Sequence, residues 1–254
     1  MTRRRFIADT WTPTTATLIG DQAAHLARVL RAAPGQIYDI VANGFLHRAE
    51  ITSVSDQQVA FTLHEELSSD AALPLHLLLA IFKFDHMEWA IEKATELGIA
   101  RITPILARRT EKHLSQAALK RSERWRRIAL EASKQSRRTD IPDIPDPIAL
   151  KAALAEEKSP TRILLSETEQ TTTLTTALED AKGSYKPGCP TSGPSDVGSR
   201  ITHAIAIGPE GGWTTEEISL FTRHQWQPVT LGPRILRAET AAIAAIAIAS
   251  THLL

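Results

Sequence analysis

Hydrophobic and polar positions alternate over much of the first 70 residues of the chain. Residues 36–42 show this alternation, Asn43-Gly44 is a pair typical of a tight hairpin turn, and residues 45–54 are predicted as the partner strand. A further strand is predicted over residues 59–63, in which every second side chain is hydrophobic. A short helix over residues 21–31 interrupts these strands. Several short strands in so few residues predict a small β-barrel.

Strands and helices alternate in the rest of the chain. Residues 65–74 are polar and end in a proline, so we predict a linker between one domain over residues 1–70 and a second over 74–254. Residues 75–82 form a continuous apolar run, which is typical of a buried parallel strand. Further strands are predicted at 102–106, 162–166, 201–207 and near 229–231, and helices at 115–135, 148–157, 174–180, from Thr214 and over the Ala- and Ile-rich C-terminus. This alternation predicts an α/β domain with a mainly parallel sheet.

Three sequence signals place the ends of helices. Asp85, followed three residues later by Glu88, predicts the start of a helix that Gly98 ends. Thr214 with Glu217 predicts a second start of the same kind. We therefore expect capping boxes at both Asp85 and Thr214.

Composition narrows the class of protein. The 254 residues are 43% hydrophobic, enough for a real core in one large domain or two modest ones. A single cysteine, Cys189, excludes a disulfide framework and a Cys-rich metal site. It lies in the Gly-, Pro- and Ser-rich segment 182–200, which predicts a surface loop. No apolar stretch approaches the roughly 20 residues that span a bilayer, and no signal peptide is recognisable. We expect a soluble, cytoplasmic protein without membrane attachment or metal.

Charge is distributed unevenly along the chain. The sequence carries 29 basic and 29 acidic residues, yet residues 101–140 hold twelve Lys and Arg against four acids, a local charge of +8. Such a concentration can attract a polyanion. A solvated helix face would explain the same charges, so this pattern alone leaves both interpretations open.

Two segments remain after common catalytic motifs are excluded. The chain has no P-loop, no Gly-x-Gly-x-x-Gly, no Gly-x-Ser-x-Gly and no His-Glu-x-x-His. Residues 207–212 read Ile-Gly-Pro-Glu-Gly-Gly after a predicted strand, and glycines there let the backbone approach a ligand closely, although a tight structural turn fits equally. Residues 231–240 combine a Gly-Pro turn, two arginines and a Glu-Thr pair before a helix of small residues.

Together the two segments resemble the RsmE family, the 16S ribosomal RNA uracil-N3 methyltransferases of the SPOUT class. The resemblance extends to other parts of the chain, in the same order as in the family. These parts are residues 25–31 with Gly35, Met87-Glu88 and residues 92–98, Pro104 and Arg109, Arg124-Trp125, and Gln135 to Arg138. The family commonly has Glu-Gln-x-Gly-Arg where this chain has Lys134-Gln135-Ser136-Arg137-Arg138. The changes from Glu to Lys134 and from Gly to Arg137 add positive charge.

The resemblance implies a PUA/OB-like β-barrel that binds RNA, followed by a SPOUT methyltransferase domain with a parallel sheet and a trefoil knot. It also implies S-adenosylmethionine (SAM) as cofactor, a homodimer, and 16S rRNA as partner within the assembled 30S subunit. Carried over position by position, the cofactor pocket comprises Leu165, Ser166, Glu167, Ile207, Gly208, Pro209, Glu210, Gly211, Gly212, Leu231, Gly232, Arg234, Ile235, Leu236, Arg237, Thr240 and Ala241.

The reaction that the resemblance implies needs the N3 proton of uracil removed or the resulting anion stabilised. We expect Arg237, with Arg138, to stabilise that anion or to hold a phosphate, and Glu239 to act as base or to pair with an arginine. Further phosphate contacts are expected at Arg3, Arg4, Arg5, Arg28, Arg31, Arg108, Arg109, Arg124 and Arg127.

Two other functions compete with this one. One is a SPOUT enzyme that methylates tRNA or a ribose hydroxyl, against which the signature at residues 25–31 argues. The other is a non-catalytic RNA-binding or assembly factor, against which the intact segments 208–212 and 231–240 argue. Cofactor titration separates an enzyme from the second alternative.

Overall fold

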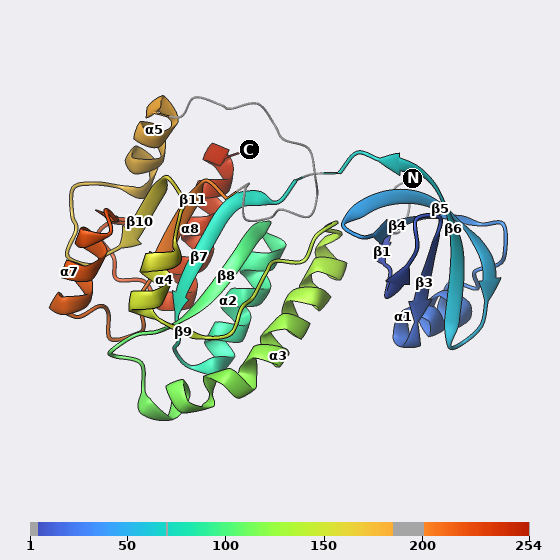
Figure 1. Cartoon of the computed structure of the whole chain (residues 1–254), viewed down its shortest axis with the longest axis horizontal. Coiled ribbons are helices and arrows are strands. Elements are labelled where there is room, and N and C mark those ends of the chain that lie inside the picture. The colour runs from blue at the N-terminus through green and yellow to red at the C-terminus, as the bar shows by residue number, and fades with distance from the viewer. Residues whose placement is uncertain (1–4, 70, 185–200, 254) are drawn as a thin grey trace. The chain divides into compact units, whose positions relative to one another are not determined.

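A computed structural model describes residues 5–69, 71–184 and 201–253 of the chain (Figure 1). The chain divides into two compact units. Residues 1–71 together with 133–140 make up the first, and residues 72–132 with 141–254 make up the second. Arg3, Arg4 and Cys189 lie outside the described residues.

The first unit is built on a six-stranded, mainly antiparallel sheet. Its strands follow the order β1 (Arg5–Ile7), β4 (Ile37–Ala42), β5 (Phe45–Val54), β6 (Gln58–Leu67), β3 (Thr15–Ile19) and β2 (Thr10–Trp11). Strands β1 and β2 are separated by only two residues yet lie at opposite ends of this order. The backbone N–H of Ala8 donates to Val41 (2.8 Å) and that of Asp9 to Thr17 (2.9 Å). The connection between β1 and β2 therefore joins the two edges of the sheet.

Local sequence signals account for much of this unit. Asn43 (φ 52°) and Gly44 (φ 80°) both take the left-handed conformation that a two-residue hairpin requires, and the predicted hairpin is confirmed. The predicted helix at 21–31 is a short α1 (Gly20–Ala24) that continues as a π-helical turn, His25–Val29. Leu26 of that turn is buried in the core of the unit with Phe61 of β6.

The second unit contains a six-stranded sheet in which all pairs are parallel, as predicted. Its order is β12 (Gln227–Val229), β10 (Thr161–Leu165), β11 (His203–Ile207), β7 (Leu73–Ala80), β8 (Ile99–Leu106) and β9 (Ile148–Ala149). The helices are α2 (Phe84–Glu96), α3 (Lys112–Ser136), α4 (Leu150–Glu156), α5 (Leu174–Ser184), α7 (Thr215–Arg223) and α8 (Ala238–Leu253).

Side chains on the two faces of the parallel sheet belong to separate cores. Leu75, Leu77 and Leu79 of β7 pack in a cluster with residues of α2, α3, α5 and α8. Leu78 points to the other face, where it joins residues of α4 and α7. Helices therefore cover both faces of the sheet (Figure 1), which explains the continuous apolar run of β7.

Two predicted element ends differ from the structure. Helix α2 begins at Phe84 with Lys83 at its N-cap and no side-chain cap, so the predicted capping box at Asp85 is wrong. Glu88 instead accepts two hydrogen bonds from Arg124, from Nε (2.6 Å) and Nη2 (2.7 Å). The capping box of Thr214 and Glu217 is confirmed, as is the end of α2 at Gly98 (φ 94°). Residues 182–184, predicted as loop, end helix α5.

Candidate functional site

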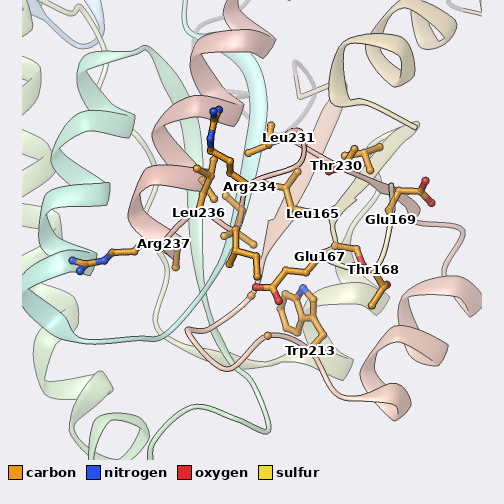
Figure 2. Close-up of a pocket in the computed structure, with 18 of the residues that line it drawn as sticks. Leu165, Glu167, Thr168, Glu169, Trp213, Thr230, Leu231, Arg234, Leu236 and Arg237 are labelled. Atoms are coloured by element: carbon orange, nitrogen blue, oxygen red, sulfur yellow. The ribbon is translucent and has the colours of Figure 1, made fainter. Parts of the chain in front are cut away.

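Three loops that follow neighbouring strands surround one cavity of about 920 Å³ (Figure 2). The loops leave β10 at Leu165, β11 at Ile207 and β12 at Val229. Because β11 and β12 flank β10 in a parallel sheet, the carboxyl ends of all three strands meet at the same edge. Ligands of open α/β sheets bind outside this edge, so the cavity is the candidate functional site.

The cavity brings together the residues expected to hold a cofactor. All of them line it except Thr240, which is exposed in the first turn of α8. The lining also includes residues that were not expected at the cofactor, of which Arg109 was expected to contact RNA: Arg109, Thr168, Glu169, Gln170, Thr173, Trp213, Ile218, Val229, Thr230, Pro233 and Ala238. Several of these follow β10, so the rule that ligands bind at carboxyl ends of strands would have found them.

The loop after β10 is held in shape by Glu169. One carboxylate oxygen accepts hydrogen bonds from Thr171 Oγ1 (2.6 Å) and from the backbone N–H groups of Thr171 (2.8 Å) and Thr172 (2.9 Å). These hydrogen bonds hold the pKa of Glu169 at about 2. The carboxylate is therefore ionised at neutral pH and fixes one wall of the cavity.

Side chains pack against the loop after β11 at two of its glycines, and the packing is tight at Gly208. A Cβ atom at Gly208 would lie 3.1–3.4 Å from the indole of Trp213, and one at Gly211 would lie 3.4 Å from side-chain carbons of Arg109. The N–H of Gly212 donates to the carbonyl of Pro209 at 2.8 Å and closes the turn. The backbone of this turn can therefore approach a ligand closely.

Arg237 and Glu239, two expected catalytic residues, have different surroundings. Arg237 is exposed, lines the cavity and makes no ion pair with any described residue. Its guanidinium points away from the other labelled side chains (Figure 2). Glu239 is buried and does not line the cavity, and its Oε1 lies 3.4 Å from Nδ1 of His86, a contact that is an ion pair only when the imidazole is protonated, rather than beside an arginine. Of these two residues, only Arg237 is therefore accessible to a substrate.

Arg138 lies in the first unit, in the turn that follows α3. Its side chain is buried, and Nη2 lies 2.5 Å from Asp140 Oδ2. Its neighbour Arg137, where the resembling family commonly has glycine, takes the left-handed conformation (φ 61°) that favours glycine. The carbonyl of Arg137 accepts a hydrogen bond from the guanidinium of Arg5. The backbone of this turn therefore keeps a glycine-like shape despite the substitution.

The other expected RNA contacts divide into paired and unpaired arginines. Arg28 pairs with Asp56 (2.8 Å), Arg124 with Glu88, and Arg109 donates to the carbonyl of Gly211. The exposed side chains without an ion pair in the described part of the chain are those of Arg31, Arg108 and Arg127. Internal pairing therefore offsets part of the positive charge of residues 101–140.

Comparison with known proteins defines the class to which this fold and site belong. Residues 69–250 match the model of the RNA methyltransferase domain, which covers most of the chain, including all three cavity loops. Ribosomal RNA small subunit methyltransferase E from Bacillus subtilis is 31% identical over 236 residues, which cover 91% of this chain and 88% of that protein. Its counterpart from Synechocystis is 34% identical over 236 residues, covering 92% and 72%. The chain belongs to the ribosomal RNA small subunit methyltransferase E family.

Solved structures agree with this assignment. Ribosomal RNA small subunit methyltransferase E from Neisseria gonorrhoeae, bound to S-adenosyl methionine, has a TM-score of 0.76 and 28% identity, covering 98% of each chain. Within the described residues of the present chain, no helix is both long and apolar enough to cross a membrane. The same residues contain no group of three or more His, Cys, Asp or Glu side chains arranged to hold a metal ion.

Proposed function

We propose that this protein is a SAM-dependent methyltransferase that modifies N3 of a specific uridine in 16S rRNA. The observation that carries the proposal is the cavity in which both segments of the family resemblance, residues 207–212 and 231–241, meet the loop after β10. Membership of the family supplies the reaction class. The resemblance in sequence indicates which nucleobase is methylated, uracil, and at which atom, N3.

The cavity fits SAM in size and in chemistry. Its volume of about 920 Å³ lies in the range of small-molecule sites. Leu165, Ile207, Leu231 and Leu236 offer apolar surface for an adenine ring, and the glycine turn offers backbone polar groups. The Nε1 atom of Trp213 is buried without a hydrogen-bond partner in the described structure and is a donor available to a ligand. These residues would hold the cofactor.

The chain's own residues account for the remaining requirements of the reaction. When bound, SAM supplies an electrophilic methyl group on a positively charged sulfur. Uracil N3 becomes a nucleophile only when its proton passes to the solvent, and the exposed guanidinium of Arg237 stabilises the negative charge that then develops. Holding the uracil near the cavity supplies further acceleration through orientation. Glu239 is buried away from the cavity, which disfavours it as the group that takes the proton directly.

The substrate must present an unpaired uracil, because N3 lies on the Watson–Crick edge of the base. We assign RNA binding to the β-rich first unit as a PUA/OB-like barrel, with Arg31 as a phosphate contact, and to Arg108 and Arg127 of the second unit. The assembled 30S subunit in the cytoplasm is the proposed substrate.

The finer architecture proposed for the second unit is a trefoil knot formed by the loops after β11 and β12. The proposed assembly is a homodimer. The side chain of Ile235, 80% exposed beside the cavity, offers apolar surface that a second copy of the chain can bury.

Titration with SAM, followed by transfer of its labelled methyl group to 30S subunits that lack the modification, tests the proposed function. We expect saturable binding of SAM and incorporation of label into 16S rRNA. Binding without incorporation into any RNA would contradict the assigned substrate, and no binding at all would favour a non-catalytic RNA-binding protein.

A further inference from the structure

Glu217 joins two loops that are distant in sequence. Its buried carboxylate accepts a hydrogen bond from the backbone N–H of Thr214 through Oε2 (2.9 Å), as a capping box requires. The other oxygen, Oε1, accepts from the backbone N–H of Arg108 at 2.8 Å. Arg108 belongs to the loop after β8, so the second bond goes beyond helix capping and ties this loop to the start of α7.

Arg109 continues the connection toward the cavity. Its Nη1 donates to the carbonyl of Gly211 at 2.6 Å, and its side-chain carbons lie against the position that a Cβ of Gly211 would occupy. Thr110, the next residue, donates from Oγ1 to the carbonyl of Ile81 at 2.9 Å. The loop after β8 is thus fixed to the residue that follows β7. It also holds the glycine turn, through the hydrogen bond from Arg109 to the carbonyl of Gly211.

Trp213 supports another part of the same turn. Its indole lies against Gly208 and makes an edge-on contact with Phe221 of α7, with ring centroids 4.8 Å apart. Residues 208–212 therefore have a side-chain contact near each end, with Trp213 at Gly208 and Arg109 at Gly211. The Trp213 contact depends on where the N-terminus of α7 lies, because Trp213 directly precedes the N-cap residue Thr214. The Arg109 contact is connected to the same helix through the hydrogen bond between Arg108 and Glu217.

We propose that Arg109 and Glu217 are positioning residues for the methyl donor. They hold the Gly208–Gly212 turn in the conformation that receives the cofactor, and neither takes part in the chemistry. A turn ordered in advance binds more tightly, because the free energy of ordering it is not subtracted from binding. This inference rests on the proposed function and assigns Arg109, expected from the sequence to contact phosphate, to the cofactor side of the site.

Arginine variants in the full-length protein test the role of Arg109. Arg109→Ala should weaken SAM binding roughly tenfold, the effect of losing one charge-assisted hydrogen bond. Arg223→Ala is the matched control, because Arg223 is exposed on α7 and does not line the cavity, and it should change the dissociation constant less than about twofold. Arg109→Lys keeps a donor and should restore part of the affinity.

Carboxylate variants test the role of Glu217. The amide of Glu217→Gln has one acceptor and cannot serve both N–H groups, whereas Glu216→Gln removes the same charge from the exposed neighbour. Thr214→Ala removes the other half of the capping box and leaves the tie to Arg108 intact. We expect Glu217→Gln to lose SAM affinity, and Thr214→Ala to lower the melting temperature while binding SAM normally.

The readouts separate positioning from stability and from RNA contact. Calorimetric SAM affinity, the melting temperature and KM for 30S subunits are measured for each variant. A rise in the SAM dissociation constant with unchanged RNA KM, in variants that remain folded, supports the proposal. Unchanged SAM affinity in folded Arg109→Ala, or a loss confined to RNA KM, overturns it. Failure of the wild-type protein to bind SAM would instead contradict the proposed function.

Discussion

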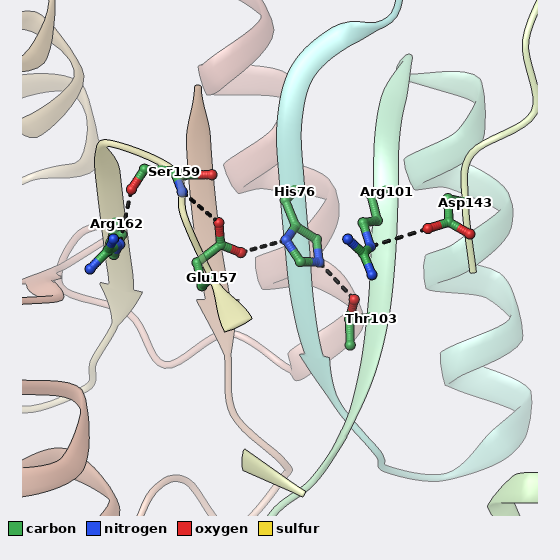
Figure 3. A network of polar contacts seen from close by, with 7 residues as sticks. All are labelled: His76, Arg101, Thr103, Asp143, Glu157, Ser159 and Arg162. Carbon is green, nitrogen blue, oxygen red and sulfur yellow. Dashed lines mark hydrogen bonds and ion pairs between the residues drawn. The ribbon is translucent and has the colours of Figure 1, made fainter. Parts of the chain in front are cut away.

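Replacing Glu157 with glutamine removes the carboxylate at the centre of a polar network in the second unit (Figure 3). The side chain of Glu157 is only 5% exposed, and Oε2 lies 2.5 Å from Nδ1 of His76. Its Oε1 accepts the backbone N–H of Ser159 at 2.8 Å. The other ring nitrogen of His76 lies 2.7 Å from Thr103 Oγ1, so the network extends from β7 to β8.

The loss of folding free energy expected in Glu157→Gln can be worked out from the pKa of Glu157. Burial by itself raises this pKa, but the hydrogen bond and charge of His76 and the hydrogen bonds of Ser159 hold it at about 2, below its ordinary value of 4.5. This lowering corresponds to about 3 kcal/mol in favour of the folded state when the carboxylate is ionised. The contribution is complete above the unfolded pKa of 4.5 and is lost as the pH falls from there to about 2.

Urea unfolding over a range of pH measures this contribution. Near pH 7 the free energy of unfolding of Glu157→Gln should be about 3 kcal/mol below that of the wild type, and the two curves should converge only as the pH falls toward about 2. Glu156→Gln, at the exposed neighbouring position, should be close to the wild type throughout. A difference between Glu157→Gln and the wild type that stays constant with pH, or an equal loss in Glu156→Gln, would refute the reasoning.

Three further predictions concern the site and its RNA substrate. Gly208→Ala places a Cβ 3.1–3.4 Å from Trp213 and should weaken SAM binding in calorimetry with little change in melting temperature, because the backbone there is not left-handed; unchanged affinity would contradict the packing argument. Arg237→Ala should lower single-turnover methyl transfer by roughly a hundredfold, a larger factor than its effect on the SAM dissociation constant; normal turnover would remove Arg237 from the mechanism. RNA affinity should fall steeply with salt, and Arg127→Ala should reduce the slope of log affinity against log salt by about one, whereas Arg124→Ala, whose guanidinium is already paired with Glu88, should reduce it less; equal slopes in the two variants would contradict this assignment.

Sequence patterns predicted those parts of the fold that local interactions determine. The hairpin at Asn43-Gly44 depends on two adjacent residues, and the capping box at Thr214 on residues three apart. The parallel sheet followed from continuous apolar strands between helices. Asp85 has the same spacing to an acidic residue as a capping box, but Glu88 pairs with Arg124 of α3, and a single sequence does not show such a tertiary contact.

The family resemblance named most of the residues that line the cavity, whereas the long-range contacts that hold its loops were not foreseen. Arg109 reaches the cavity through a hydrogen bond to a residue more than a hundred positions later, so its charge alone suggested phosphate binding. Glu217 gave a clear capping signal, but nothing in the sequence indicated its second bond to Arg108. The partner of Glu239, His86, lies on a different helix, and no local pattern links the two. These contacts could not be predicted because the residues that form them are far apart in the sequence, and local patterns do not report such pairs.

Nucleoside analysis of the methylated product shows which atom of which base this protein modifies. The protein is incubated with isotopically labelled SAM and 30S subunits that lack the modification, and the digested rRNA is examined by mass spectrometry. We expect label in 3-methyluridine from 16S rRNA and its loss in Arg237→Ala. Label in any other nucleoside, or in 3-methyluridine to the same extent with Arg237→Ala, would contradict the account.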